Sequence, residues 1–106
     1  MIQKELEKTI EIISDANVTL KLEYYITKKR TKKGELLYGI SIKKYIGDNV
    51  GTYILGDEES EFAVTYSYLE IKRICKVLSK HEVTPLTLIY VIDDIIDDKA
   101  ELYNVS

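Results

Sequence analysis

A serine and a glutamate two-thirds of the way along the chain mark the point where strand-like sequence gives way to helices. Ser67 and Glu70 form the S-x-x-E pattern of a capping box, in which the serine hydroxyl accepts from a first-turn amide and the glutamate reaches back to the cap. Apolar residues recur after the box at the spacing of one helix face. The pattern predicts a helix from Tyr68 to about His81.

A second helix is predicted a few residues later. Val83 precedes a proline and so favours an extended backbone, Thr84 is a capping residue type, and Pro85 suits the first helical position. The residues that follow are apolar around most of the helix circumference. We therefore expect this helix to begin at Pro85, to lie against both the sheet and the first helix, and to form the centre of the core.

The first two-thirds of the chain reads as β-strands. Residues 18–28 and 36–46 alternate apolar and polar side chains with a period of two, and the loop between them contains Gly34, which predicts an antiparallel hairpin. Two shorter strands are expected at residues 52–55 and 62–66, separated by a turn at Gly56-Asp57-Glu58.

Residues 1–13 fit either a helical stripe or a strand, and the β-branched residues that dominate them favour the strand. These patterns together predict an α+β fold: an antiparallel β-meander of four to five strands at residues 1–66, then a C-terminal helical hairpin at residues 67–98 packed on one sheet face. Residues 99–106 form a tail. A chain of 106 residues should bury roughly 60–65% of its unfolded surface, enough for a single domain at residues 1–106 without disulfides or metal.

Four short stretches resemble a family of uncharacterised proteins, each roughly 100 residues long, from low-G+C Gram-positive bacteria. The likeness spans residues 18–96, and its motifs are strand, turn, cap and core residues, so it implies a fold and no catalytic residue. The stretches are Leu22-Glu23-Tyr24-Tyr25, Tyr38-Gly39-Ile40, Val83-Thr84-Pro85 and Val91-Ile92-Asp93-Asp94.

Few residue types that support catalysis are present. The chain has one cysteine and one histidine, and Cys75 and His81 lie roughly 240° apart around the predicted helix, which is too far for a nucleophile and its base. Two aspartates four residues apart could share Mg²⁺, but no second group of carboxylates completes its coordination. We therefore expect no enzyme activity, no cofactor and no metal site.

The expected location is the cytoplasm. One cysteine cannot form an internal disulfide, and the first residues lack the apolar core of a signal peptide. The longest nearly apolar run, residues 86–92, is far shorter than the ~20 residues that cross a bilayer, so we expect no membrane association.

Two surfaces are candidates for binding a protein partner. The sheet face opposite the helices should expose a row of large side chains, and tyrosine-rich surfaces are common interfaces. The second helix carries four aspartates near its C-terminus, where they oppose the helix dipole and need another reason to be there. The predicted partner-binding residues are Tyr25, Leu37, Tyr45 and Tyr53 on the sheet, and Asp93, Asp94, Asp97 and Asp98 on the helix.

A nucleic-acid site is an alternative hypothesis at the tip of the first hairpin. Its basic residues, with tyrosines nearby, could hold phosphate, although the net charge of −3 makes nucleic acid an unlikely partner overall. The residues are Lys28, Lys29, Arg30, Lys32 and Lys33.

The leading hypothesis is a small non-enzymatic cytoplasmic protein-interaction module that regulates or inhibits another protein. A phage- or mobile-element-encoded inhibitor of a host system, such as an anti-defence protein, is one alternative, and nucleic-acid binding through the hairpin is another. A homodimer formed sheet to sheet is also open. The hypothesis follows from an acidic chain with interaction surfaces and no recognisable catalytic set.

Overall fold

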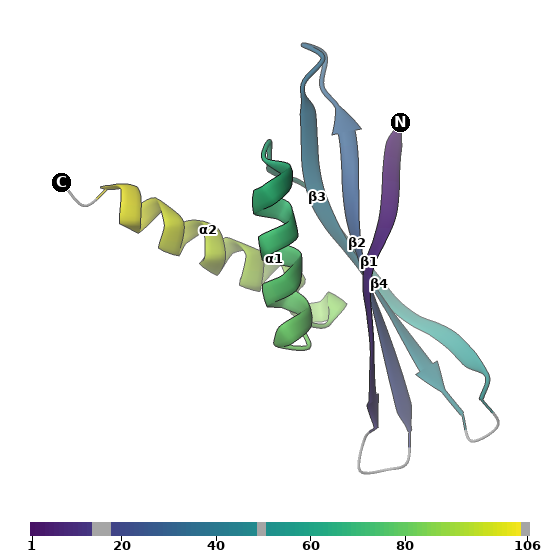
Figure 1. Ribbon diagram of the computed structural model, residues 1–106. Coiled ribbons are helices and arrows are strands. Elements are labelled where there is room, and N and C mark those ends of the chain that lie inside the picture. Colours follow the sequence, from purple (N-terminus) through teal and green to yellow (C-terminus); the bar gives the residue numbers. More distant parts are fainter. Residues whose placement is uncertain (14–17, 49–50, 105–106) are drawn as a thin grey trace.

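The computed structural model describes the backbone of residues 1–13, 18–48 and 51–104, and the side chains of those residues as far as 96. Figure 1 shows a sheet of long strands with helices on one side of it. The elements are β1 (Ile2–Ile13), β2 (Thr19–Arg30), β3 (Leu36–Gly47), β4 (Tyr53–Thr65), α1 (Tyr68–Lys80), the short 3-10 helix η1 (Pro85–Thr87) and α2 (Leu88–Asn104).

The strands form one antiparallel meander in the order β1-β2-β3-β4, and the two helices follow it. The predicted α+β fold is confirmed. The N-terminal segment is a strand, as favoured, because its Ile10 and Ile12 lie opposite Leu22 and Leu20 of β2 and pack against the core. Among the described residues, no helix combines the length and the apolarity needed to cross a membrane.

The prediction of two short strands at residues 52–55 and 62–66 is wrong, because β4 is continuous from Tyr53 to Thr65. Gly56 is an extra residue where the register shifts: Leu55 lies opposite Tyr45, and Asp57 lies opposite Lys44. The residues that suggested a turn therefore form a bulge within the ladder.

The core lies between the central strands and α1. The fully buried side chains of β2 and β3 meet an apolar stripe of α1, and Ser67 caps this helix by accepting from the Glu70 amide at 3.2 Å. The core is formed by Leu22, Tyr24, Ile26, Ile40, Ile42, Ile71, Ile74, Cys75, Leu78, Val83, Leu88 and Ile92.

The prediction that the second helix forms the centre of the core is wrong. It starts through η1 at Pro85, and its buried side chains are Leu88 and Ile92, whereas Ile89 and Ile96 stay exposed. The physical reason is that α1 already covers the central strands, so α2 contacts β4 and α1 and then runs away from the sheet (Figure 1). Thr84 holds the cap position, without a capping hydrogen bond from its side chain.

One buried hydrogen bond ties the junction between the helices to the sheet. The Tyr24 hydroxyl on β2 donates to the Val83 carbonyl at 2.8 Å, and the Tyr24 side chain is fully buried. α1 ends in a Schellman motif, in which the Val83 amide donates to the Leu78 carbonyl and the Glu82 amide to the Ser79 carbonyl. Glu82 takes the left-handed position with φ 53°. The backbone that leads into η1 is thus held to the sheet by the Tyr24 hydrogen bond and to the end of α1 by the Schellman hydrogen bonds.

Tyr24→Phe should lower the free energy of unfolding by about 1–3 kcal/mol, because it leaves the buried Val83 carbonyl without its donor. Denaturant unfolding measures the loss. Tyr66→Phe, at an exposed position, is the matched control and should change stability by less than about 0.5 kcal/mol. Equal stability of the two variants would show that the hydrogen bond does not hold the junction.

Gly39→Ala should destabilise the fold by more than about 2 kcal/mol, because a Cβ there would collide with the backbone of Glu61 and Phe62 where β4 crosses β3. Gly56→Ala is the control, since its Cβ would meet the flexible Ile46 side chain at 3.0 Å and the Lys44 carbonyl only at the ordinary contact distance of 3.6 Å. Thermal unfolding of both variants tests the close approach, and a Gly56→Ala effect as large as that of Gly39→Ala would contradict it.

Candidate functional site

The two reactive residue types do not form a catalytic site. Cys75 is a fully buried core residue of α1, and burial, with a smaller contribution from Glu7, raises the pKa of its thiol to about 12. His81 is exposed at the C-cap of α1. A thiol with so high a pKa is a poor nucleophile. Within the described part of the chain, no group of three or more His, Cys, Asp or Glu side chains could hold a metal ion.

The predicted sheet residues do share one face, the one opposite the helices. By register, Tyr25 of β2 lies on the same face as Tyr45 and Leu37 of β3 and Tyr53 of β4. All four are only half exposed. We call this surface the uncovered face.

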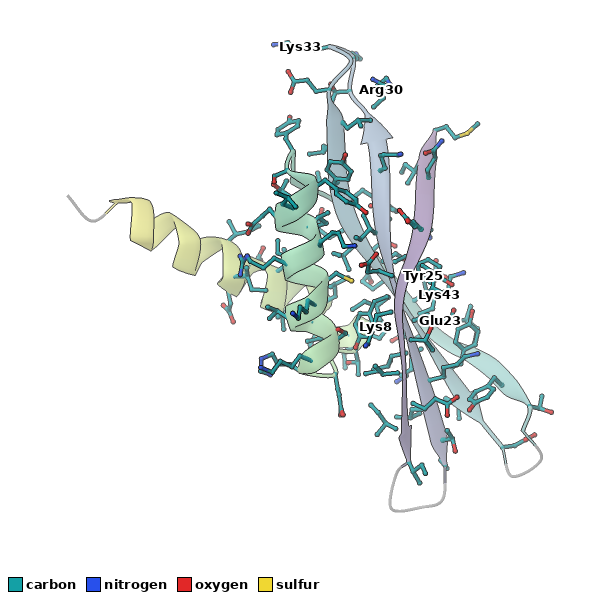
Figure 2. All side chains as sticks on the ribbon, in the orientation of Figure 1. Lys8, Glu23, Tyr25, Arg30, Lys33 and Lys43 are labelled. Atoms are coloured by element: carbon teal, nitrogen blue, oxygen red, sulfur yellow. The ribbon has the colours of Figure 1, made fainter. Side chains whose placement is uncertain are left out.

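Lysines and glutamates fill the spaces between these tyrosines. The Lys21 ammonium lies 4.8 Å from the ring centre of Tyr45 and 4.5 Å from that of Tyr53. The Lys43 ammonium lies 5.3 Å from the Tyr25 ring centre, and the Tyr25 hydroxyl donates to Glu23 at 2.8 Å. Figure 2 shows Glu23, Tyr25 and Lys43 together on the side of the sheet away from the helices. The rings are therefore already engaged as cation–π and hydrogen-bond partners.

The two edge strands are linked across the uncovered face. Lys4 of β1 reaches Glu58 of β4 at 3.6 Å, and the Tyr53 hydroxyl of β4 donates to Glu11 of β1 at 3.4 Å. Beneath these links, Thr27 and Ser41 are only 1% and 0% exposed, although no helix lies over them. The small residues in the middle of the uncovered face are thus covered by its own long side chains, while Leu6 and Leu55 on the edge strands remain exposed. A partner would have to break these contacts to reach the small residues beneath.

The basic hairpin tip lies at the end of the sheet beyond the helices, where Figure 2 labels Arg30 and Lys33. Lys28, Lys29, Arg30, Lys32 and Lys33 are all exposed. Arg30 donates to the Gly34 carbonyl at 2.7 Å, closing the turn. One of the candidate cations thus supports the loop, and nucleic-acid binding stays a prediction.

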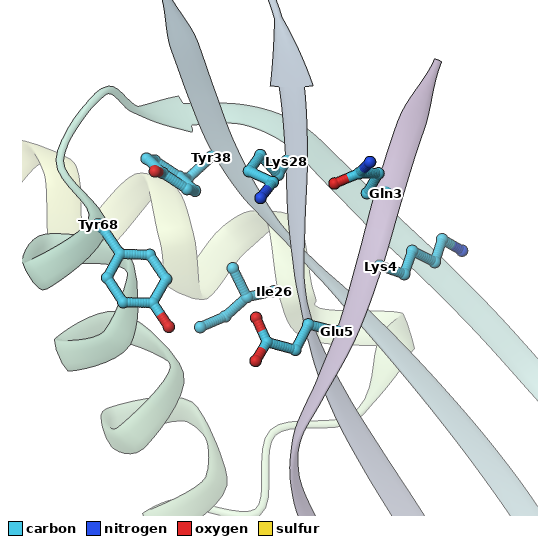
Figure 3. A pocket seen from close by; sticks show the side chains of 7 residues that line it. All are labelled: Gln3, Lys4, Glu5, Ile26, Lys28, Tyr38 and Tyr68. Carbon is cyan, nitrogen blue, oxygen red and sulfur yellow. The ribbon is translucent and has the colours of Figure 1, made fainter.

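The described residues enclose a smaller and a larger hollow between the sheet and α1. The smaller, of about 130 Å³, is shown in Figure 3 between Tyr38, Tyr68 and the start of β1, and it is below the ~300 Å³ of an ordinary ligand pocket. The larger, of about 460 Å³, lies between β1 and α1 and has basic walls. Lys72 there pairs with Glu7 at 2.9 Å and Arg73 pairs with Glu70 at 2.6 Å, so these two cations are already neutralised.

A further surface with exposed apolar side chains is on η1 and α2. Leu86 and Tyr90 are 77% and 70% exposed, and Ile89 and Ile96 are also exposed. We call these four side chains the η1–α2 apolar surface. Sequence reasoning placed this helix in the core and missed the surface, although the apolar circumference of the helix was visible.

Two of the four predicted aspartates lie on the same helix as this surface. Asp93 and Asp94 are exposed on α2, whereas the side chains of Asp97 and Asp98 lie outside the described residues. A second acidic group, on β4, was not predicted, because Asp57 was assigned to a turn and Glu59 and Glu61 fell outside the predicted strands. Alternation of acidic residues at positions 57, 59 and 61 was the available signal, since it places their side chains on one face of a strand.

One family model matches the chain. It is described as "Family of unknown function (DUF6514)" and matches residues 3–98, from β1 into α2. No curated protein and no solved structure matches. The family description assigns no activity, so function must be argued from the surfaces.

Glu23→Gln should lower the pKa of Tyr25, which burial and then the hydrogen bond to Glu23 raise to about 12. A neighbouring carboxylate disfavours the phenolate, so removing its charge lowers the pKa, while burial keeps it above 10. NMR titration of ¹³C-labelled tyrosines measures the change. The exposed and remote Glu35→Gln is the control, and a Tyr25 pKa unchanged by Glu23→Gln would contradict the arrangement on the uncovered face.

Proposed function

The chain belongs to the family of unknown function whose model matches residues 3–98, and we propose that it is a small protein-interaction module that docks through the η1–α2 apolar surface. In this proposal it catalyses no reaction, is located in the cytoplasm and regulates or inhibits the protein that it binds. The lack of a paired nucleophile and base at Cys75 and His81 supports the non-enzymatic part.

The observation that carries the proposal is the exposure of large apolar side chains on η1 and α2. Leu86, Ile89 and Tyr90 project from η1 and the first turn of α2, and Ile96 lies two turns further along. An aromatic side chain alone buries ~150–250 Å² on association. Contiguous apolar patches beyond a few hundred Å² on a soluble protein usually mark an interaction site.

The η1–α2 apolar surface is also held in place before any partner arrives. Pro85 is buried and fixes the backbone at the start of η1, and Leu88 and Ile92 anchor α2 in the core. A preorganised surface loses less conformational entropy on binding than a mobile one. The uncovered face is less suited to docking, because Lys4, Glu58 and the neighbouring pairs close it.

The source and the target are finer points of the proposal. We infer a Gram-positive bacterial origin from the likeness in the strand, turn and cap motifs, among them Val83-Thr84-Pro85. An inhibitor encoded by a phage or mobile element is one form of the proposed regulator.

Leu86→Ser with Tyr90→Ser should abolish or weaken partner binding at least about tenfold, because the two most exposed side chains of the surface lose their apolar contacts. The tagged protein is used as bait in a lysate of its own organism, the retained protein is identified and purified, and its affinity is measured by calorimetry. Both substitutions are at exposed positions, so the fold should persist.

The matched control is Tyr66→Ser with Leu69→Ser, which changes an equally exposed tyrosine and leucine near the start of α1. It should bind the partner as the wild type does. A partner that binds the wild type and both double variants with equal affinity would refute docking through the η1–α2 apolar surface.

A further inference from the structure

A groove runs between β4 and the start of α2. Its volume is about 270 Å³, and one wall is formed by Pro85, Leu86, Leu88 and Ile89. The other wall is formed by Asp57, Glu59, Ser60 and Glu61 of β4. We call it the β4–α2 groove. It continues the η1–α2 apolar surface, since Leu86 and Ile89 belong to both.

The three carboxylates of the groove stand in a row. Asp57, Glu59 and Glu61 are spaced by two residues along β4 and lie on the helix side of the sheet, opposite Lys44, Ile42 and Ile40 of β3. Successive side chains of such a row are ~7 Å apart. That spacing matches cationic side chains two residues apart on an extended segment.

These carboxylates keep their negative charge uncompensated. Within the described residues none of the three makes an ion pair, and the nearest basic residue by register, Lys44 opposite Asp57, lies outside ion-pair distance. Their hydrogen bonds are to local amides: the Glu58 amide donates to Asp57 at 3.0 Å, and the Ser60 amide donates to Glu59 at 3.3 Å.

The other face of the same strand shows the opposite arrangement. Glu58 points to the uncovered face and pairs with Lys4 at 3.6 Å and with Lys43 at 3.8 Å. The lysines of the sheet therefore neutralise the carboxylate that faces away from the helices and leave the groove acidic. Exposed Asp93 and Asp94, further along α2, add to the negative potential of this helix.

We propose that the β4–α2 groove binds a lysine- or arginine-containing segment of a partner protein. An aliphatic side chain of that segment packs against Leu86 and Ile89, and its cations lie along Asp57, Glu59 and Glu61. This inference rests on the proposed function and names the chemistry of the partner. Complementary charge favours such a segment over nucleic acid, whose phosphates the groove would repel.

A second copy of the chain fits the groove less well than a separate partner. One cationic segment on this chain is α1, where Lys72 and Arg73 already pair with Glu7 and Glu70. Another is the tip of the β2–β3 hairpin, whose exposed residues Lys32 and Lys33 are polar. The nearest aliphatic residues, Leu36 and Leu37, are half-buried within β3. The tip therefore offers charge without an aliphatic anchor.

The experiment is an NMR titration of the ¹⁵N-labelled protein with a 12-residue leucine–lysine amphipathic peptide at low salt, and with its leucine–glutamate counterpart. The lysine peptide should give saturable shifts at residues 57–61 and 85–89, and the glutamate peptide should give none. Glu59→Gln with Glu61→Gln keeps the side-chain shape and should weaken binding at least about tenfold. Glu5→Gln with Glu35→Gln makes the same change in net charge away from the groove and should weaken it less than about twofold.

Shifts centred elsewhere, or equal weakening by both pairs of variants, would overturn the inference. A second contrary result is that the Glu59→Gln with Glu61→Gln variant aggregates without any change in peptide affinity. That result would show that the carboxylates only prevent aggregation through the edge strand β4, and it would also overturn the inference. Light scattering that shows a dimer broken by the peptide would assign the groove to a second copy.

The natural partner separates this inference from the proposed function. If Leu86→Ser with Tyr90→Ser loses that partner while Glu59→Gln with Glu61→Gln retains its full affinity, the docking surface stands and the cationic segment is wrong. If neither double variant changes the affinity for the natural partner, the docking surface and the cationic segment are both wrong. If each double variant loses the partner while both control pairs retain it, both proposals are supported.

Discussion

The hydrogen bond from the Tyr24 hydroxyl to the Val83 carbonyl is the interaction on which the arrangement of the helices depends. It joins the central strand β2 to the residue between α1 and η1, 59 positions later in the chain, inside a fully apolar core. A buried carbonyl without a donor costs ~1–3 kcal/mol, so the position that satisfies it is strongly favoured. Burial raises the pKa of the Tyr24 hydroxyl, which therefore keeps its proton at ordinary pH.

The exposed apolar surface follows from that constraint. Val83 is held against the sheet and η1 begins two residues later, at Pro85, so η1 starts beside β4. The central strands β2 and β3 are already covered by α1. α2 can then bury one stripe, through Leu88 and Ile92 with Val91 and Ile95 partly buried beside them, and it presents Ile89, Tyr90 and Ile96 to solvent. Charge is divided by the same geometry: paired charges bridge the uncovered face, while unpaired carboxylates of β4 face α2. Both effects place apolar and acidic side chains together where η1 and α2 meet β4.

The sequence predicted the elements whose signals are local. The alternation at residues 18–28 and 36–46 and the cap at Ser67 depend on neighbours within a few positions, and β2, β3 and α1 form as expected. β4 was divided in two because Gly56-Asp57-Glu58 has the composition of a turn. What keeps the strand continuous is pairing with Lys43 and Lys44 on β3, which single-strand patterns do not report. The prediction that α2 forms the centre of the core failed for a related reason. The apolar sequence of a helix does not show how much of the sheet is left uncovered by other helices. The β4–α2 groove combines both non-local features and was therefore missed.

Hydrogen–deuterium exchange of the protein alone and in complex with its captured partner tests the central claim most directly, because it locates the docking surface without any substitution. The account predicts that the partner slows exchange at residues 85–96 and along residues 57–61. Exchange along residues 19–30 of β2, beneath the uncovered face, should be unchanged. Protection confined to the central strands, with none on η1 and α2, would contradict the account.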